Sequence, residues 1–137
     1  MRQQKAQAAE AADGTQEDQK PRPKKVVKPP PIPTWDITPT DEAIELAVSI
    51  NQALSTDGAV TPEKDTLVVA PEHLVAFARY IHDDRGYDLL SNITGVDYLG
   101  RAGDRFEVVY HAYSTGQPDK SMLTFKARAS EENPELP

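Results

Sequence analysis

Three histidines and one pair of carboxylates are the residues whose types could support catalysis or metal binding in this chain. His73 and His82 are nine residues apart, which places them on opposite sides of a helix, and His111 falls in a different segment. A zinc site needs three or four ligands that converge on one ion. The spacing therefore predicts histidines that face solvent or a partner, and no metal site.

The carboxylate pair is Asp97 and Glu107, which can approach one another across a hairpin. Two carboxylates can divide acid and base roles when burial separates their pKa values. Carboxylates are mostly exposed in proteins, however, so we expect both to be solvated charges on a strand. Arg105 is expected to form an ordinary surface ion pair with Asp97 or Asp104. A stand-alone hydrolase that uses Asp97, Glu107 and His111 is therefore the least favoured function.

Several classes of site are excluded by what the sequence lacks. The chain contains no cysteine, so it can provide no disulfide, no thiolate ligand for iron–sulfur clusters or metals, and no cysteine nucleophile. The loop 100–104 holds two glycines, but it is not GxGxxG and Asp104 would repel phosphate, so it is predicted to be a turn. No GxSxG, P-loop, HExxH or EF-hand pattern is present. The sequence also contains no run of 18 apolar residues, which is about the length needed to span a membrane.

Charge divides the chain into two parts. Residues 1–35 carry seven Lys/Arg and four Asp/Glu, whereas residues 36–137 carry eight Lys/Arg and eighteen Asp/Glu, a net charge of −10. An acidic body repels the phosphate backbone, so nucleic acid is not an expected partner.

The division coincides with a change in composition. Residues 20–33 hold six of the twelve prolines and five basic residues, which is typical of an extended, solvated segment. We expect 1–35 to be a disordered, Pro-rich basic arm that acts as a spacer, and 36–137 to be one folded domain. The alternative use of the arm is as a ligand for a proline-binding groove or an acidic partner.

The folded part begins with two expected helices. The first runs from Asp41 to near Ser55, capped by Thr38 or Thr40, with Trp35 packed nearby. A strand or short hairpin at 58–70 leads to a second helix that starts at Pro71 and stops at Gly86. The apolar residues that recur at helical spacing are Ile44, Ala47, Val48, Ile50 and Leu54 in the first helix, and Leu74, Val75, Phe77, Ala78 and Ile81 in the second.

Three segments with alternating polarity follow, at 89–98, 105–113 and 122–129, and predict an antiparallel meander. Gly95 is expected to mark a bulge or a close approach of backbone. The core face is predicted to hold Phe106, Val108, Tyr110 and Ala112 of the middle strand and Leu123, Phe125, Ala127 and Ala129 of the last. The sequence thus predicts an α+β domain, with two helices packed on a small mixed, largely antiparallel sheet.

The meander also carries a family resemblance. Residues 90–98 (LSNITGVDY), 105–111 (RFEVVYH) and 123–128 (LTFKAR) resemble the thirty-kilodalton or C subunit of the proton-translocating NADH:quinone oxidoreductase, respiratory complex I. Phe125 stands where the family has an aliphatic residue. The resemblance is expected to cover roughly 41–137, so that the chain is the N-terminal α+β part of the family's protein and lacks the C-terminal signature region.

The resemblance implies a structural subunit without a cofactor, which supports electron transfer from NADH to quinone in the peripheral arm. The implied partners are the quinone-pocket subunit and the terminal iron–sulfur subunit, with the complex bound peripherally on the cytoplasmic side of the cell membrane. A partner-facing surface is expected at Asp97, Tyr98, Arg105, Glu107, Val109, His111 and Tyr113. The alternatives are the equivalent subunit of a membrane-bound hydrogenase or plastid-type complex, or a small binding module that uses its proline-rich arm.

Overall fold

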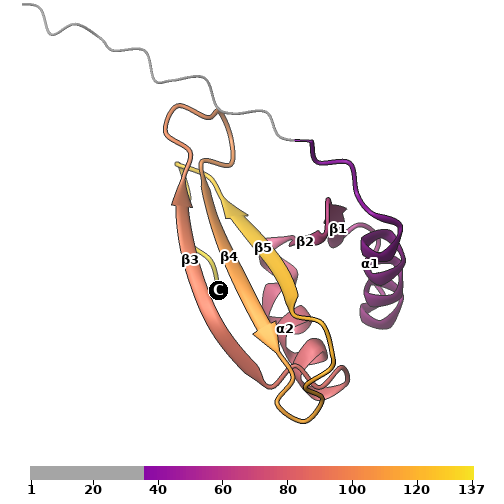
Figure 1. Ribbon diagram of the computed structural model, residues 1–137. Coiled ribbons are helices and arrows are strands. Elements are labelled where there is room, and N and C mark those ends of the chain that lie inside the picture. Colours follow the sequence, from indigo (N-terminus) through magenta and orange to yellow (C-terminus); the bar gives the residue numbers. More distant parts are fainter. Residues whose placement is uncertain (1–35) are drawn as a thin grey trace, which may run out of the picture.

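The computed structural model describes residues 36–137, which fold into two α-helices, one short 3-10 helix and five strands (Figure 1). The predicted α+β class is confirmed. Trp35 and the basic arm, 1–35, lie outside the described residues. The elements in chain order are α1 (Asp41–Leu54), β1 (Val60–Glu63), β2 (Thr66–Val69), η1 (Pro71–His73), α2 (Leu74–Asp83), β3 (Leu89–Asp97), β4 (Phe106–Tyr113) and β5 (Leu123–Ala129).

The five strands form one sheet in the order β1-β2-β5-β4-β3. The predicted meander β3–β4–β5 is confirmed, and both of its pairings are antiparallel. The hairpin β1–β2 joins the sheet through the one parallel pairing, in which Leu67, Val68 and Val69 of β2 lie beside Phe125, Lys126 and Ala127 of β5. As a result β5, the last strand in the chain, lies at the centre of the sheet (Figure 1).

The core lies between the helices and one face of the sheet. Phe125 of β5 is its centre, with its ring 4.9 Å from the ring of Phe77 in α2 and stacked at 4.8 Å on the ring of Tyr110 in β4. The predicted core face of β5 is confirmed, because every second residue from Leu123 to Ala129 is buried. On β4 the predicted face is also correct by register, since Tyr110 pairs with Phe125 and Ala112 with Leu123.

Some apolar residues predicted to face the core are exposed instead. On α1 the buried residues are Ala43, Ala47 and Ile50, whereas Ile44 and Val48 remain 40% and 50% exposed. The buried residues are spaced three and four apart and form one stripe along the helix. Ile44 and Val48 directly follow buried residues in the sequence, so they lie at the edge of that stripe. The same holds for Val75 and Ala78 of α2, which are exposed beside buried Leu74, Phe77 and Ile81.

The two expectations for Gly95 are wrong. A Cβ atom at Gly95 would meet nothing within 4 Å, so no backbone approaches closely. The register of β3 against β4 is regular there and shifts between Leu90 and Asn92 instead. The bulge thus lies near the start of β3.

Helix α1 is capped at its N-terminal end and bonded to β1 near its C-terminal end. Thr40 is the N-cap, as predicted, and its hydroxyl accepts a hydrogen bond from the Ala43 N–H at 3.2 Å. Near the C-terminal end, the Asn51 amide donates to the carbonyl of Val60 at 2.7 Å and accepts from the Val60 N–H at 3.0 Å. Because Val60 is 1% exposed, no solvent can replace these two bonds.

We therefore predict that Asn51→Ala lowers the free energy of unfolding by about 1–3 kcal/mol, because it leaves the buried N–H and C=O of Val60 unpaired. Urea titration followed by circular dichroism measures the change. Gln52→Ala, at the neighbouring exposed position of α1, is the control and should change stability by less than about 0.5 kcal/mol. Equal effects of the two substitutions would contradict the role given to Asn51.

Candidate functional site

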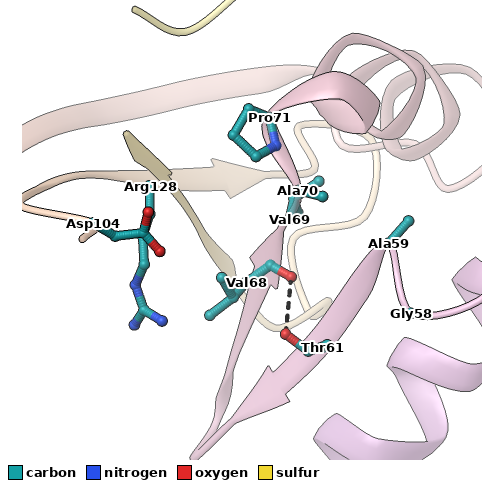
Figure 2. Close-up of a pocket in the computed structure, with 9 residues that line it drawn as sticks. All are labelled: Gly58, Ala59, Thr61, Val68, Val69, Ala70, Pro71, Asp104 and Arg128. Carbon is teal, nitrogen blue, oxygen red and sulfur yellow. Dashed lines mark hydrogen bonds between the residues drawn. The ribbon is translucent and has the colours of Figure 1, made fainter. Parts of the chain in front are cut away.

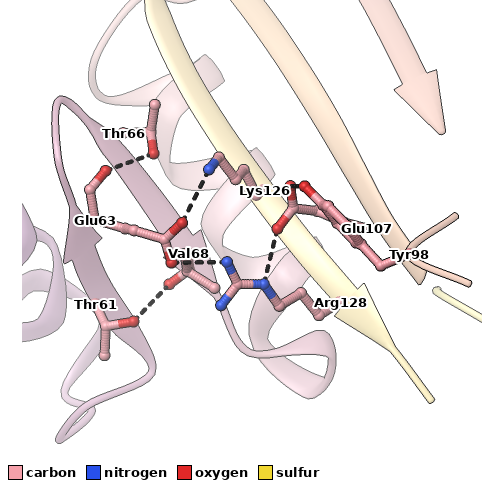
Figure 3. A network of polar contacts seen from close by, with 8 residues as sticks. All are labelled: Thr61, Glu63, Thr66, Val68, Tyr98, Glu107, Lys126 and Arg128. Atoms are coloured by element: carbon pink, nitrogen blue, oxygen red, sulfur yellow. Dashed lines mark hydrogen bonds and ion pairs between the residues drawn. The ribbon is translucent and has the colours of Figure 1, made fainter. Parts of the chain in front are cut away.

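The face of the sheet that points away from the core carries a network of charged side chains (Figure 3). Lys126 and Arg128 alternate with the buried residues of β5, so both project onto this open face. Glu63 comes from the end of β1 and Glu107 from β4. Four side chains from three strands are therefore brought together at the middle of the sheet.

Arg128 is the centre of the network. Its Nε donates to Oε2 of Glu107 at 2.8 Å, and its Nη2 donates to Oε2 of Glu63 at 2.7 Å. The other oxygen of Glu63 accepts from Lys126 Nζ at 3.1 Å, and the other oxygen of Glu107 accepts from the Tyr98 hydroxyl at 3.2 Å (Figure 3). All four carboxylate oxygens are thus hydrogen-bonded.

Glu107 corrects the expectation of a solvated strand charge, because the residue is only 3% exposed. Removing a carboxylate from water costs several kcal/mol unless it is paired and hydrogen-bonded. Arg128 and Tyr98 meet that requirement on both oxygens. The side chains of Lys126 and Arg128 are likewise only 19% and 21% exposed. The polar face is therefore less accessible to solvent than the alternation of polar and apolar residues suggests.

The pKa shifts of Glu63 and Arg128 both favour the charged form. Burial raises the pKa of the Glu63 carboxyl, but hydrogen bonds from Arg128 and Lys126 outweigh burial, and the net pKa is lowered. For Arg128 burial lowers the pKa, whereas the bonds to Glu107 and Glu63 raise it above its ordinary value. A carboxylate with a depressed pKa is a weak base near neutral pH, so Glu63 is unsuited to proton abstraction. The arrangement clamps strands together.

Asp97 and Arg105 form a separate ion pair at the end of the β3–β4 hairpin, as predicted. Nε and Nη2 of Arg105 donate to the two oxygens of Asp97 at 2.7 and 2.9 Å, and Nη1 reaches Glu131 at 2.6 Å. The hydrogen bond from Arg105 is the main cause that lowers the pKa of Asp97. Because Asp97 pairs with Phe106 and Val96 pairs with Glu107, the two carboxylates of the expected acid–base pair point to opposite faces.

The seven residues expected to face a partner therefore fall into two separate groups. Tyr98 and Glu107 are bonded to one another, and Val109, His111 and Tyr113 follow along the open face of β4. His111 is half-buried, with Nδ1 3.1 Å from the Thr124 hydroxyl. Asp97 and Arg105 form the other group. Contact of any of the seven with a partner stays a prediction.

Sequence reasoning missed Glu63 as a member of the site. Glu63 lies 63 and 65 residues before its partners Lys126 and Arg128. Only the parallel pairing of β2 with β5 brings these segments together. The one signal in the sequence is the alternation of Lys126 and Arg128 on a strand, which requires acidic partners on a neighbouring strand once the face is partly covered.

A hollow of about 250 Å³ lies beside the network and is lined by the hairpin β1–β2, the β3–β4 loop and β5 (Figure 2). Its charged lining residues are Arg128 and Asp104. Arg128 is already bonded to two carboxylates, which leaves the hollow with mainly backbone and small apolar surface. The full lining is Gly58, Ala59, Thr61, Val68, Val69, Ala70, Pro71, Asp104 and Arg128.

Within residues 36–137, no three acidic or histidine side chains gather as a metal site would require. Over the same range, neither helix has the length and apolarity needed to cross a bilayer.

Comparison with known proteins gives a match over 67–137 to the family described as "Respiratory-chain NADH dehydrogenase, 30 Kd subunit". The matched range begins at β2 and includes α2 and the whole meander. It is shorter than the range expected from the resemblance, and it leaves out α1 and Glu63.

Curated relatives, each named as the C subunit of an NADH-quinone oxidoreductase, are similar over about half of the chain. The protein of Roseiflexus castenholzii is 45% identical over 71 residues, which are 50% of this chain and 39% of that protein. The proteins of Geotalea uraniireducens and Geobacter sulfurreducens are 41% and 42% identical over 48% and 45% of this chain, and 38% and 37% of theirs. The chain therefore spans about two fifths of the length of the relatives it matches.

We predict that Glu107→Ala lowers the free energy of unfolding by about 2 kcal/mol or more, because the partly buried Arg128 loses one of its two carboxylates. Chemical denaturation at pH 7 measures the loss. Asp97→Ala, which removes the more exposed ion pair with Arg105, is the control and should cost clearly less. A larger loss from the control would show that the buried network does not stabilise the sheet.

The depressed pKa of Glu63 predicts a pH dependence. A carboxyl whose folded pKa lies below its ordinary value of 4.5 stabilises the fold above that pH, and the contribution disappears as the pH falls through the folded pKa. The difference in unfolding free energy between the protein and Glu63→Gln should therefore be large at pH 7 and shrink below pH 4.5. Glu132→Gln, at an exposed position, is the control. A difference that is constant between pH 7 and pH 3 would refute the coupling.

Proposed function

The chain belongs to the family of the 30-kDa subunit of respiratory-chain NADH dehydrogenase, and from this premise we propose that it is a structural subunit of a proton-translocating NADH:quinone oxidoreductase. In this role it supports electron transfer from NADH to quinone and carries neither a cofactor nor catalytic residues of its own. It contributes rigid contact surface to the peripheral arm.

The observation that carries the proposal is the extent of the family match. Residues 67–137 include β2, α2 and the complete β3–β4–β5 meander, which together form the centre and one edge of the sheet. The buried network of Arg128, Glu107 and Tyr98 lies within that range. Those three residues stiffen the open face, and a stiff face costs little conformational entropy when a partner docks on it.

The proposed partners are the subunit that forms the quinone pocket and the subunit that carries the terminal iron–sulfur cluster. The names of the relatives support a place in such an assembly. The chemistry of this chain agrees, since a sequence without cysteine offers no thiolate to an iron–sulfur cluster and electrons must pass through siblings. The complex would hold the chain peripherally on the cytoplasmic side of the membrane. Residues 36–137 would be the docking domain and 1–35 a spacer.

The proposal predicts that an affinity-tagged copy of the chain, expressed in its own organism, co-purifies with NADH:quinone oxidoreductase activity from membranes solubilised in mild detergent. The isolated chain should show no such activity. Deletion of residues 1–33 should leave co-purification nearly intact, because the docking surface lies in the folded domain.

Three results would contradict the proposal. Recovery of the tagged chain without any respiratory subunit would remove it. Recovery with the subunits of a membrane-bound hydrogenase would redirect it to a related complex. Loss of partners on deletion of 1–33 would favour a binding module that acts through its arm.

A further inference from the structure

Strand β3 forms one edge of the sheet and pairs with β4 alone (Figure 1). Eight of its nine residues are exposed. They include three large apolar side chains, since Leu89, Leu90 and Ile93 are 47%, 48% and 57% exposed. Edge strands are normally short, covered or charged in proteins that act alone, because an open apolar edge pairs with other chains.

The bulge in β3 gathers two of these side chains on one face. Leu90 pairs with Ala112 and Ile93 pairs with Tyr110, which are two residues apart on β4 and hence on the same face. Leu90 and Ile93 are three residues apart, a spacing that would place them on opposite faces of a regular strand. The shift in register between Leu90 and Asn92 brings them to the same face. Tyr110 in turn stacks on Phe125, so the core face continues outward to β3 and is left uncovered there.

Apart from the bulge near its start, the edge carries few of the usual devices that prevent pairing. The sequence of β3, LLSNITGVD, contains no Lys, Arg or Pro, and its one charge, Asp97, is bonded to Arg105. The Tyr98 N–H donates to the Arg105 carbonyl at 2.9 Å. From this bond, the alternation of an antiparallel ladder directs the N–H and C=O groups of Gly95 and Ile93 outward.

We propose that β3 accepts an extended strand from a partner subunit, which adds to the sheet as a sixth strand. The inference rests on the proposed function for the existence of that subunit. The added strand has apolar side chains at alternate positions, which cover Leu90 and Ile93, and its backbone bonds to the free edge. It carries neutral or basic residues, because the domain that it joins has a net charge of −10.

Two other segments could occupy the edge: β3 of a second copy of this chain, or the chain's own residues 20–33. Charge disfavours the first, and backbone chemistry disfavours the second. Pairing of β3 with β3 of a second copy would bring together two domains that each carry a net charge of −10. The chain's own residues 20–33 have the right sign, but their six prolines remove backbone donors that an added strand needs.

Site-specific cross-linking in the assembled complex tests the inference. The photoreactive residue p-benzoylphenylalanine is placed at position 93 of the full chain, or at position 48 as the control, since Val48 on α1 is 50% exposed and lies outside the sheet. Irradiation of native membranes should join position 93 to a respiratory subunit, at a peptide of alternating apolar residues without Asp or Glu. Position 48 should give no such product.

A second pair of variants measures the contribution of the edge. Ile93→Lys should reduce the amount of chain retained in the purified complex by about tenfold, as for a contact in the centre of an interface, whereas Val48→Lys should leave it unchanged. Thermal unfolding of each isolated variant confirms that it folds.

The outcomes separate this inference from the proposed function. If the chain assembles, but position 93 forms no product and Ile93→Lys assembles normally, the edge is not the docking strand and the proposed function stands. A product of twice the chain mass, or one joined to 1–35, identifies a different occupant and also overturns the inference. Failure of the unmodified chain to co-purify removes the proposed function, and the docking strand with it.

Discussion

The parallel pairing of β2 with β5 is the constraint on which both faces of the sheet depend. On one face it places Leu67 beside Phe125, so that the hairpin contributes to the core under α1 and α2. On the other face it brings Glu63 to Lys126 and Arg128. A slip of one residue would exchange the two faces, exposing Leu67 and burying charge without a partner. Apolar packing and ion pairing therefore specify the same register.

The polar network contributes more to this specificity than to net stability. Buried ion pairs often do little better than apolar residues of the same size, because desolvation offsets their attraction. Every oxygen of Glu63 and Glu107 has a partner, however, and a one-residue slip of β5 would turn Lys126 and Arg128 away from both carboxylates. The network thus favours the observed pairing, and it fills the middle of the open face with paired charges.

The helices cover the sheet unevenly. The core gathers around Phe125 and Phe77, near the centre of the sheet, while β3 extends beyond that cover with both of its faces exposed. A small domain has too little helix to bury a long edge strand. Exposed apolar side chains gathered along one strand are typical of surfaces that contact another segment or molecule.

Most helices and strands could be predicted from the sequence, because they follow from local periodicity, whereas 58–70 stayed open between one strand and a short hairpin. Pro71 at the start of the second helical segment, alternation around Phe125 and the family resemblance were readable, and Thr40 was one of two candidates for the N-cap. Tertiary structure decided which polar and apolar side chains are covered. Burial of Glu107, exposure of Val48 and the pairing of Glu63 with Arg128 depend on contacts between segments far apart in the chain. Local patterns do not identify the partners in such contacts, because the covering atoms come from elsewhere in the sequence.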